Sequence, residues 1–307
     1  MTGTSSHART ITADGASTGA SLVGAGAGGS IWVMAGTLMG IGLSSFRAQG
    51  GSTTHATAGN SGPGGGGGRV ALEYDTLGGI YTVATVNTYA TAYGGSSAAG
   101  ATRAGAAETV FLKSSDQTHG ELLIHNNGLA PTSTVTTSMA PLPATPTITT
   151  VSATTLNASS GTLGNNSGNA ANQWVGFHVN PNTSQNATLI LMDGPFFAIS
   201  ANTSSSLTVA SRDTTAAPVN AVASSTFRPV LDLDNFEVAG NATLDLTGVQ
   251  VRVRNGDLSA NDTTTFRLDG ILKAHTVDIG TSGVWSNPSS YSETGITRKC
   301  SSTSACP

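Results

Sequence analysis

Short runs in which two apolar residues flank one polar residue recur along this chain of 307 residues. In the second half, a glycine soon follows such a run. The examples are Phe236-Glu237-Val238, Leu244-Asp245-Leu246, Phe266-Arg267-Leu268 and Val277-Asp278-Ile279, with Gly240, Gly248, Gly270 and Gly280 after them. A period of two is typical of a strand that buries one face, and glycine tolerates the positive φ of a tight bend. The pattern predicts many strands of about three to five residues with glycine at the corners.

The first half shows the same alternation. Apolar positions that alternate with polar or less apolar neighbours are Val70, Leu72 and Tyr74, then Val110 and Leu112; Leu207 and Val209 continue the pattern further along. Because successive side chains of a strand point to opposite faces, we expect these residues to face inward.

The spacing of the predicted strands favours a stacked architecture. A segment that begins at Pro181 is echoed about twenty positions later at Ala201, a distance typical of one coil of a solenoid. Few Asn-Gly or Asp-Gly pairs are present to close hairpins. We therefore expect an all-β chain that folds as a parallel β-solenoid (β-helix) of short strands, with small residues in a narrow interior. A β-sandwich or mixed β domains are the alternative.

Composition divides the chain into three parts. Residues 1–129 form a Gly-rich β-helix portion, and residues 155–307 form a second β-repeat portion that ends in a Cys-containing tail. Between them, residues 130–154 are rich in Pro and Thr, and their four prolines favour an extended connector. The alternative is that this segment forms outer loops of one continuous fold.

An uncharged segment from Ala16 to Ser45 is long enough to cross a membrane as a helix. It contains eight glycines, each of which disfavours a helix by up to about 1 kcal/mol relative to alanine. We therefore expect buried β structure and no membrane span. The first fifteen residues lack the basic and apolar regions of a signal peptide.

Charged residues make up only 10% of the chain, and the net charge is -4. Because no basic stripe is present to neutralise phosphates, nucleic acid is not an expected partner. The run Gly64–Gly68 shares only its glycines with a phosphate loop, since Arg69 begins a strand where such a loop requires a helix. We interpret the run as a packing feature and expect no cofactor.

The densest acidic patch, LDLDNFE, contains Asp232, Asp234 and Glu237. Carboxylate oxygens are the ligands that Ca²⁺ prefers. Alternation, however, places Asp232 and Asp234 on the solvent face of a strand whose inward residues are Leu231 and Leu233. The sequence therefore predicts a solvated strand face and no metal site.

Other ionisable residues carry weaker signals. His119 and His125 are the closest pair of the six histidines, at a spacing unlike that of a helical zinc motif. A β-helical polysaccharide lyase or hydrolase would use acidic and basic residues on one sheet face, and the candidates are Asp245, Arg252, Arg254, Asp257, Arg267 and Asp269. Glycoside hydrolysis needs two carboxylates at a defined separation, which spacing along the chain does not define. We expect no enzyme, with a carbohydrate-active enzyme as the alternative.

The only two cysteines, Cys300 and Cys306, lie near the C-terminus in a context without a strand pattern. Five residues separate them, and an exported chain meets an oxidising environment. We predict a Cys300–Cys306 disulfide that ties down the terminal segment. Pairing between two chains is the alternative.

Three segments of the first half, taken in order, resemble a known module. They are GGSIWVMAG within 26–51, GPGGGGGRVALEYD at 62–75, and TVFLK with GELLI and NNG within 107–128. Together they are similar to a Gly-rich parallel β-helix module of large bacterial cell-surface proteins and adhesins. The resemblance covers about a third of the chain, and it implies an exported structural or adhesive protein without catalytic residues to carry over.

The expected function follows from composition and this resemblance. We expect an extracellular or cell-surface protein, structural or adhesive, that presents a polar β face to a glycan or to another cell surface. A self-assembling filament subunit is a further alternative, because unpaired strand edges can pair with another copy.

Overall fold

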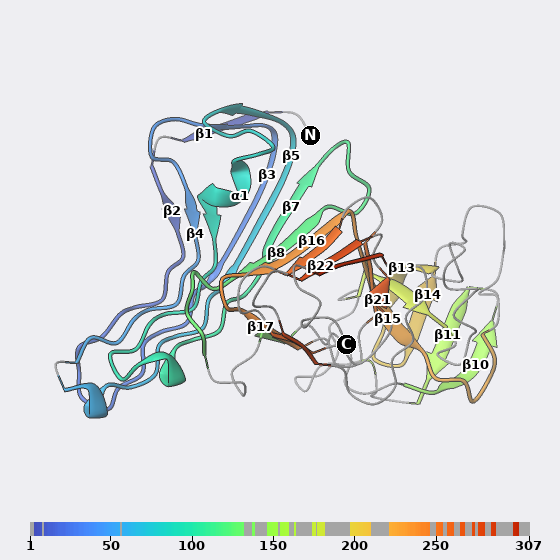
Figure 1. The fold of residues 1–307 in the computed structure, drawn as a ribbon. Helices are drawn as coiled ribbons and strands as arrows, with labels where there is room; N and C mark the ends of the chain where they lie inside the picture. Colours follow the sequence, from blue (N-terminus) through green and yellow to red (C-terminus); the bar gives the residue numbers. More distant parts are fainter. Residues whose placement is uncertain are drawn as a thin grey trace.

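The computed structural model describes residues 3–131 apart from positions 8 and 56. Beyond them it describes shorter stretches, of which 197–209 and 221–245 are the longest, and after 245 it describes strands only. Strands dominate these residues (Figure 1). Among them are one short helix, α1 (Val86–Tyr89), and two 3₁₀ turns, η1 (Ala58–Asn60) and η2 (Ala101–Arg103).

The strands form four sheets, in each of which successive members are hydrogen-bonded neighbours. The largest contains β1 (Thr4–His7), β3 (Ser30–Gly40), β5 (Arg69–Gly79), β7 (Val110–Ser114), β8 (Glu121–His125), β16 (Asn235–Ala239), β19 (Asp257–Ala260), β22 (Thr276–Ile279) and β24 (Thr297–Cys300). The second contains β10 (Ile148–Ser152), β11 (Thr155–Ala158), β14 (Ser206–Val209), β13 (Phe197–Asn202), β12 (His178–Asn180), β15 (Arg228–Leu233), β18 (Gln250–Val253) and β21 (Leu272–Lys273). The smaller sheets are β23 (Val284–Ser286), β20 (Thr265–Arg267), β17 (Thr243–Asp245) and β9 (Thr137–Ser138), and then β2 (Ile11–Thr12), β4 (Phe46–Arg47) and β6 (Ala90–Thr91).

The all-β character agrees with the prediction, but the predicted parallel β-solenoid is wrong. Strand β8 runs antiparallel to β7, and the second sheet is antiparallel from β10 through to β15. The sheets are therefore mixed. Ala201–Val209, which the sequence suggested as the echo of a coil, lies in the hairpin of β13 and β14, closed by a hydrogen bond from Thr203 N to Ser206 O at 2.9 Å. Alternation with a period of two occurs in parallel and antiparallel strands alike, so it does not identify the partner.

The turn between β7 and β8 changes which face of the largest sheet is buried. Directly opposed residues of neighbouring strands place their side chains on the same face. Buried Val110 lies opposite half-buried Leu123, whereas half-buried Phe111 lies opposite buried Leu122. Strand β16 continues the second arrangement, with buried Phe236 beside Leu122. The sheet thus buries one face over β3, β5 and β7 and the opposite face over β8 and β16.

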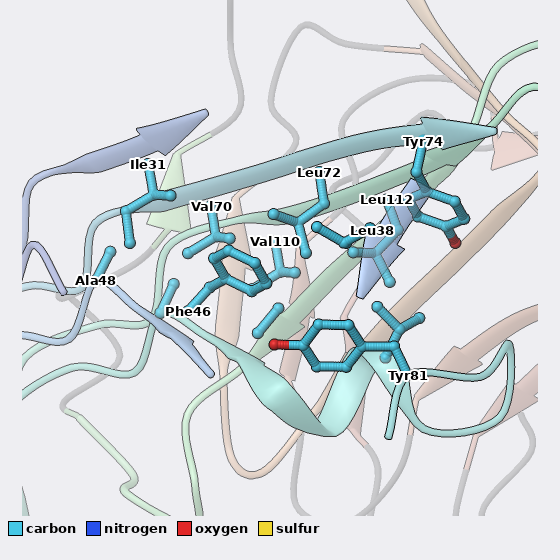
Figure 2. Packing of buried hydrophobic residues seen from close by; sticks show 13 residues of the cluster. Ile31, Leu38, Phe46, Ala48, Val70, Leu72, Tyr74, Tyr81, Val110 and Leu112 are labelled. Carbon is cyan, nitrogen blue, oxygen red and sulfur yellow. The ribbon is translucent and has the colours of Figure 1, made fainter. Parts of the chain in front are cut away.

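The first hydrophobic core lies under β3, β5 and β7. The residues there that alternation predicted to face inward are all buried: Val70, Leu72, Tyr74, Val110 and Leu112. From the opposite side, Phe46 of β4 and Tyr81 close this core, with ring centroids 6.0 Å apart (Figure 2). A second core packs around the antiparallel strands and includes Trp174, Phe197, Leu207 and Phe227.

Three glycine-rich loops project together as one arm, seen at the lower left of Figure 1. They connect β2 to β3, β4 to β5 and β6 to β7, at residues 13–29, 48–68 and 92–109. Each loop runs outward and returns. Backbone hydrogen bonds join successive loops, for example from Gly15 N to Gln49 O at 2.7 Å. We refer to these loops as the glycine arm.

The outgoing and returning passes of the glycine arm are joined through backbone atoms. Gly51 N donates to Gly26 O at 2.9 Å, Gly65 N to Gly51 O at 2.9 Å, and Gly95 N to Gly65 O at 2.8 Å. Such close approach leaves no room for side chains between the passes, so glycine is required at these contacts.

The glycine run before β5 follows a period of three. A Cβ at position 62, 65 or 68 would collide with the backbone of the first loop, and one at 64 or 67 with that of the third loop. At position 66 it would meet nothing within 4 Å. The middle loop therefore packs against a neighbour on two sides, which supports the interpretation of the run as a packing feature.

Strand β3 lies within the uncharged segment 16–45, in agreement with the predicted β structure. No helix among the described residues is long and apolar enough to cross a membrane. Strands β8 and β16 pair directly, so residues 126–234 are an excursion from one sheet. Within the predicted connector, β9 and β10 belong to different sheets, and the division of the chain into three parts stays a prediction.

Candidate functional site

The outer face of β3, β5 and β7 carries exposed aromatic, apolar and charged side chains. The strand register aligns Trp32, Ala71 and Phe111 in one row across the three strands, and Met34, Glu73 and Lys113 in the next. Trp32 is 70% exposed and Met34 is 56% exposed. We call these six residues the Trp32 face.

A hydrogen bond orients the most exposed side chain of this face. Trp32 Nε1 donates to Glu73 Oε1 at 2.9 Å, diagonally from β3 to β5. This bond draws the indole toward β5, where its row neighbour is the small Ala71. The indole is therefore held at the surface with much of its ring open to solvent, because no larger side chain stands beside it on β5.

The Trp32 face combines two kinds of interaction. An exposed indole offers a large apolar surface at little cost in side-chain entropy, which is why tryptophan is common at binding hot spots. Glu73 still has a second carboxylate oxygen that can accept from hydroxyl groups, and Lys113 in the same row can donate. An apolar ring surface beside hydrogen-bonding groups suits a sugar ring, whose C–H face is apolar and whose rim carries hydroxyls.

Sequence reasoning missed this face because the run from Ile31 to Met34 is apolar throughout, so alternation does not show which of its side chains point outward. Ile31 and Ala35 are buried, so Trp32 and Met34 fall on the outward positions of the same strand. Large apolar residues at outward positions are the informative exceptions to alternation.

Asp234 is buried, with 5% of its surface exposed, so its predicted place on a solvent face is wrong. Its Oδ2 accepts hydrogen bonds from His119 N at 2.9 Å and from Gly120 N at 3.0 Å. Leu233 is buried as predicted. The alternation ends at Leu233 because Asp234 lies in the bend between β15 and β16. There its carboxylate stabilises the turn before β8 by accepting the two backbone hydrogen bonds.

The two histidines that are close in sequence make different contacts. The His119 ring packs edge-on against His178 with centroids 5.4 Å apart, and the His125 ring packs against Tyr93 at 5.3 Å. Within the part of the chain that the structure describes, no three His, Cys, Asp or Glu side chains gather into a group that could hold a metal ion.

Other predicted site residues lie where side chains are not described. This holds for the acidic and basic set of the second half: Asp245, Arg252, Arg254, Asp257, Arg267 and Asp269. It also holds for Cys300 and Cys306, so the disulfide stays a prediction. Cys300 ends strand β24, which pairs in parallel with β22, and the expectation of a strand-free context is wrong there.

Comparisons of this chain with protein families, with curated proteins and with solved structures give no match. The resemblance to a module of bacterial surface proteins therefore stays a prediction.

Proposed function

We propose that this chain is an exported structural or adhesive protein of a cell surface or fibre and that it binds a glycan through the Trp32 face. The observation that carries the proposal is the 70% exposure of Trp32, whose indole is held by a hydrogen bond to Glu73. A large apolar side chain kept exposed at a defined orientation is a typical feature of a binding surface.

Two further features support a structural and adhesive role. Charged residues make up only 10% of the chain, so hydroxyl and amide groups supply most of its polar side chains. The glycine arm is joined by backbone hydrogen bonds between its passes, such as that from Gly65 N to Gly51 O at 2.9 Å. A projection held in this way depends little on a side-chain core, and it suits a protein that works outside the cell as a scaffold.

The experiment compares wild-type protein with Trp32→Ala on a glycan array, followed by titration calorimetry with the best glycan. We expect Trp32→Ala to weaken binding at least tenfold, and Glu73→Ala to weaken it less, because the indole remains but loses its hydrogen bond. Leu43→Ala is the matched control, since Leu43 is 90% exposed and lies outside the Trp32 face. Thermal melting of all variants should be unchanged within a few degrees.

Two outcomes would overturn this proposal. One is that no glycan on the array binds the wild-type protein. The other is that Trp32→Ala and Leu43→Ala bind the same glycan as tightly as wild type does. The alternatives are tested on the same preparation: turnover of a polysaccharide panel would indicate an enzyme, and concentration-dependent polymers in electron microscopy would indicate a filament subunit.

A further inference from the structure

A half-open cavity of about 250 Å³ lies where the first core ends. Its floor is formed by β7, β8 and β16, and its roof by α1, β6 and the residues after β6. This cavity lies on the core side of the sheet, opposite the Trp32 face, because it is lined by Val110 and Leu123 rather than by Phe111.

The strand register explains why a cavity forms here. Val70, Val110, Leu123 and Glu237 lie in one row across β5, β7, β8 and β16. The first two are buried in the core, but the row then reaches strands that bury their opposite face. At Glu237 the row carries a carboxylate, which would be costly to cover with apolar side chains. The core therefore opens into a space with a charged wall.

The chemistry of the lining is acidic and aromatic. Glu108 and Glu237 are its two carboxylates, and no lysine or arginine is among the described residues that line it. The rings of Tyr93 and His125, also part of the lining, pack against each other with centroids 5.3 Å apart. The nearest ion-pair partner described for Glu108 is Arg69, whose Nε lies 3.9 Å from Oε2 and whose side chain is 72% exposed.

The negative charge of Glu108 is only partly balanced by a cation in the folded protein. Burial raises the pKa of its carboxyl group, and the Arg69 guanidinium only partly offsets this effect. A second cation on the cavity side would compensate the carboxylate without displacing Arg69, since the ion pair with Arg69 is long and surface exposed.

We propose that this cavity binds a small organic cation, a primary amine or ammonium compound with an apolar body. The two carboxylates would take the ammonium group, the Tyr93 and His125 rings would contact its charge or its body, and Val110 with Leu123 would cover the apolar part. A cavity of 150 Å³ in another protein holds benzene, so about 250 Å³ suits a molecule of about ten non-hydrogen atoms.

The test uses 2-phenylethylamine, which is protonated at pH 7, and its neutral isostere 2-phenylethanol. Methyl resonances of Val110 and Leu123 are followed by NMR in the full chain during titration. We expect the amine to shift both resonances in a saturable manner and to bind at least tenfold more tightly than the alcohol. Glu237→Gln should weaken amine binding at least fivefold. Glu73→Gln, which removes the same charge from the outer face, should leave it unchanged.

Each contrary result overturns the proposal. Equal binding of amine and alcohol would show that the carboxylates do not select charge. Equal effects of Glu237→Gln and Glu73→Gln would show a general electrostatic attraction instead of a site. Methyl shifts with N-acetylglucosamine and none with the amine would assign the cavity to a neutral sugar. Glycan binding to the outer face is tested separately, with Trp32→Ala. The glycan proposal and the amine proposal can therefore fail independently.

Discussion

Replacement of Gly65 by alanine tests whether the glycine arm is held by backbone contact between its passes. The new Cβ would lie 2.5 Å from the carbonyl carbon of Gly26 and closer still to its oxygen. Because this is far inside van der Waals contact and the obstacle is backbone, the middle loop must move away from the first loop. An alanine at position 66 would cause no such collision, because its Cβ would meet nothing within 4 Å.

The magnitude follows from the hydrogen bonds that such a movement breaks. Two bonds join the middle loop to the first at this point: Gly51 N donates to Gly26 O at 2.9 Å, and Gly28 N donates to Gly66 O at 2.9 Å. Each bond contributes about 0.5–1.5 kcal/mol net, and a buried group left unpaired costs about 1–3 kcal/mol. We therefore expect Gly65→Ala to lower the free energy of unfolding of the arm by about 2–4 kcal/mol.

Hydrogen exchange with mass spectrometry resolves the effect by segment. Gly65→Ala should speed exchange around Gly28 and Gly51, whose N–H groups bond between the first and middle loops, by at least tenfold. Gly66→Ala is the matched control and should leave exchange unchanged or slightly slower, because it reduces only the freedom of the unfolded chain. Equal exchange in the two variants would refute the proposed period-three packing.

Three other predictions concern single side chains. Asp234→Ala should lower the free energy of unfolding by about 1–3 kcal/mol in urea, because the N–H groups of His119 and Gly120 lose their acceptor, while Asp234→Asn should cost less. Burial raises the pKa of Tyr81 to about 12, so its contribution to stability is complete below pH 10 and is lost as pH rises from 10 toward 12. Tyr81→Phe should remove that part of the alkaline loss in thermal melts, and an unchanged alkaline profile would contradict it. Burial raises the pKa of Glu108, so its contribution to the free energy of unfolding is complete below pH 4.5 and is lost as the pH rises above that value. Glu108→Gln should therefore melt higher than wild type at pH 7 but not at pH 4, and the opposite order would show that the ion pair with Arg69 dominates.

Alternation along single strands correctly predicted the buried side chains of β5, β7, β14 and β16. Val70, Leu72 and Tyr74 face the first core, and Phe236 and Val238 are buried on either side of Glu237. Gly240 has a φ of 64°, as expected for a glycine that closes such a unit. These features are local, because the direction of a side chain depends on the backbone of its own strand.

The partners of the strands were not predictable in the same way. The turn between β7 and β8 brings Leu122 opposite Phe111, and this reversal made the solenoid prediction wrong. It also separates the two surfaces on which the proposed functions depend: Phe111 joins the Trp32 face, whereas Val110 and Leu123 line the cavity. The residues of each surface come from strands that lie far apart in the sequence.

The sequence by itself determined the strand character, the inward positions of strands such as β5 and β7, and the presence of a glycine-rich region. Only the tertiary structure decided that a Cβ at position 65 would collide with backbone while one at position 66 would not, and that Asp234 is buried against the turn at Gly120. The physical reason is that conformational preference acts over neighbouring residues, whereas pairing and burial depend on which distant segments meet.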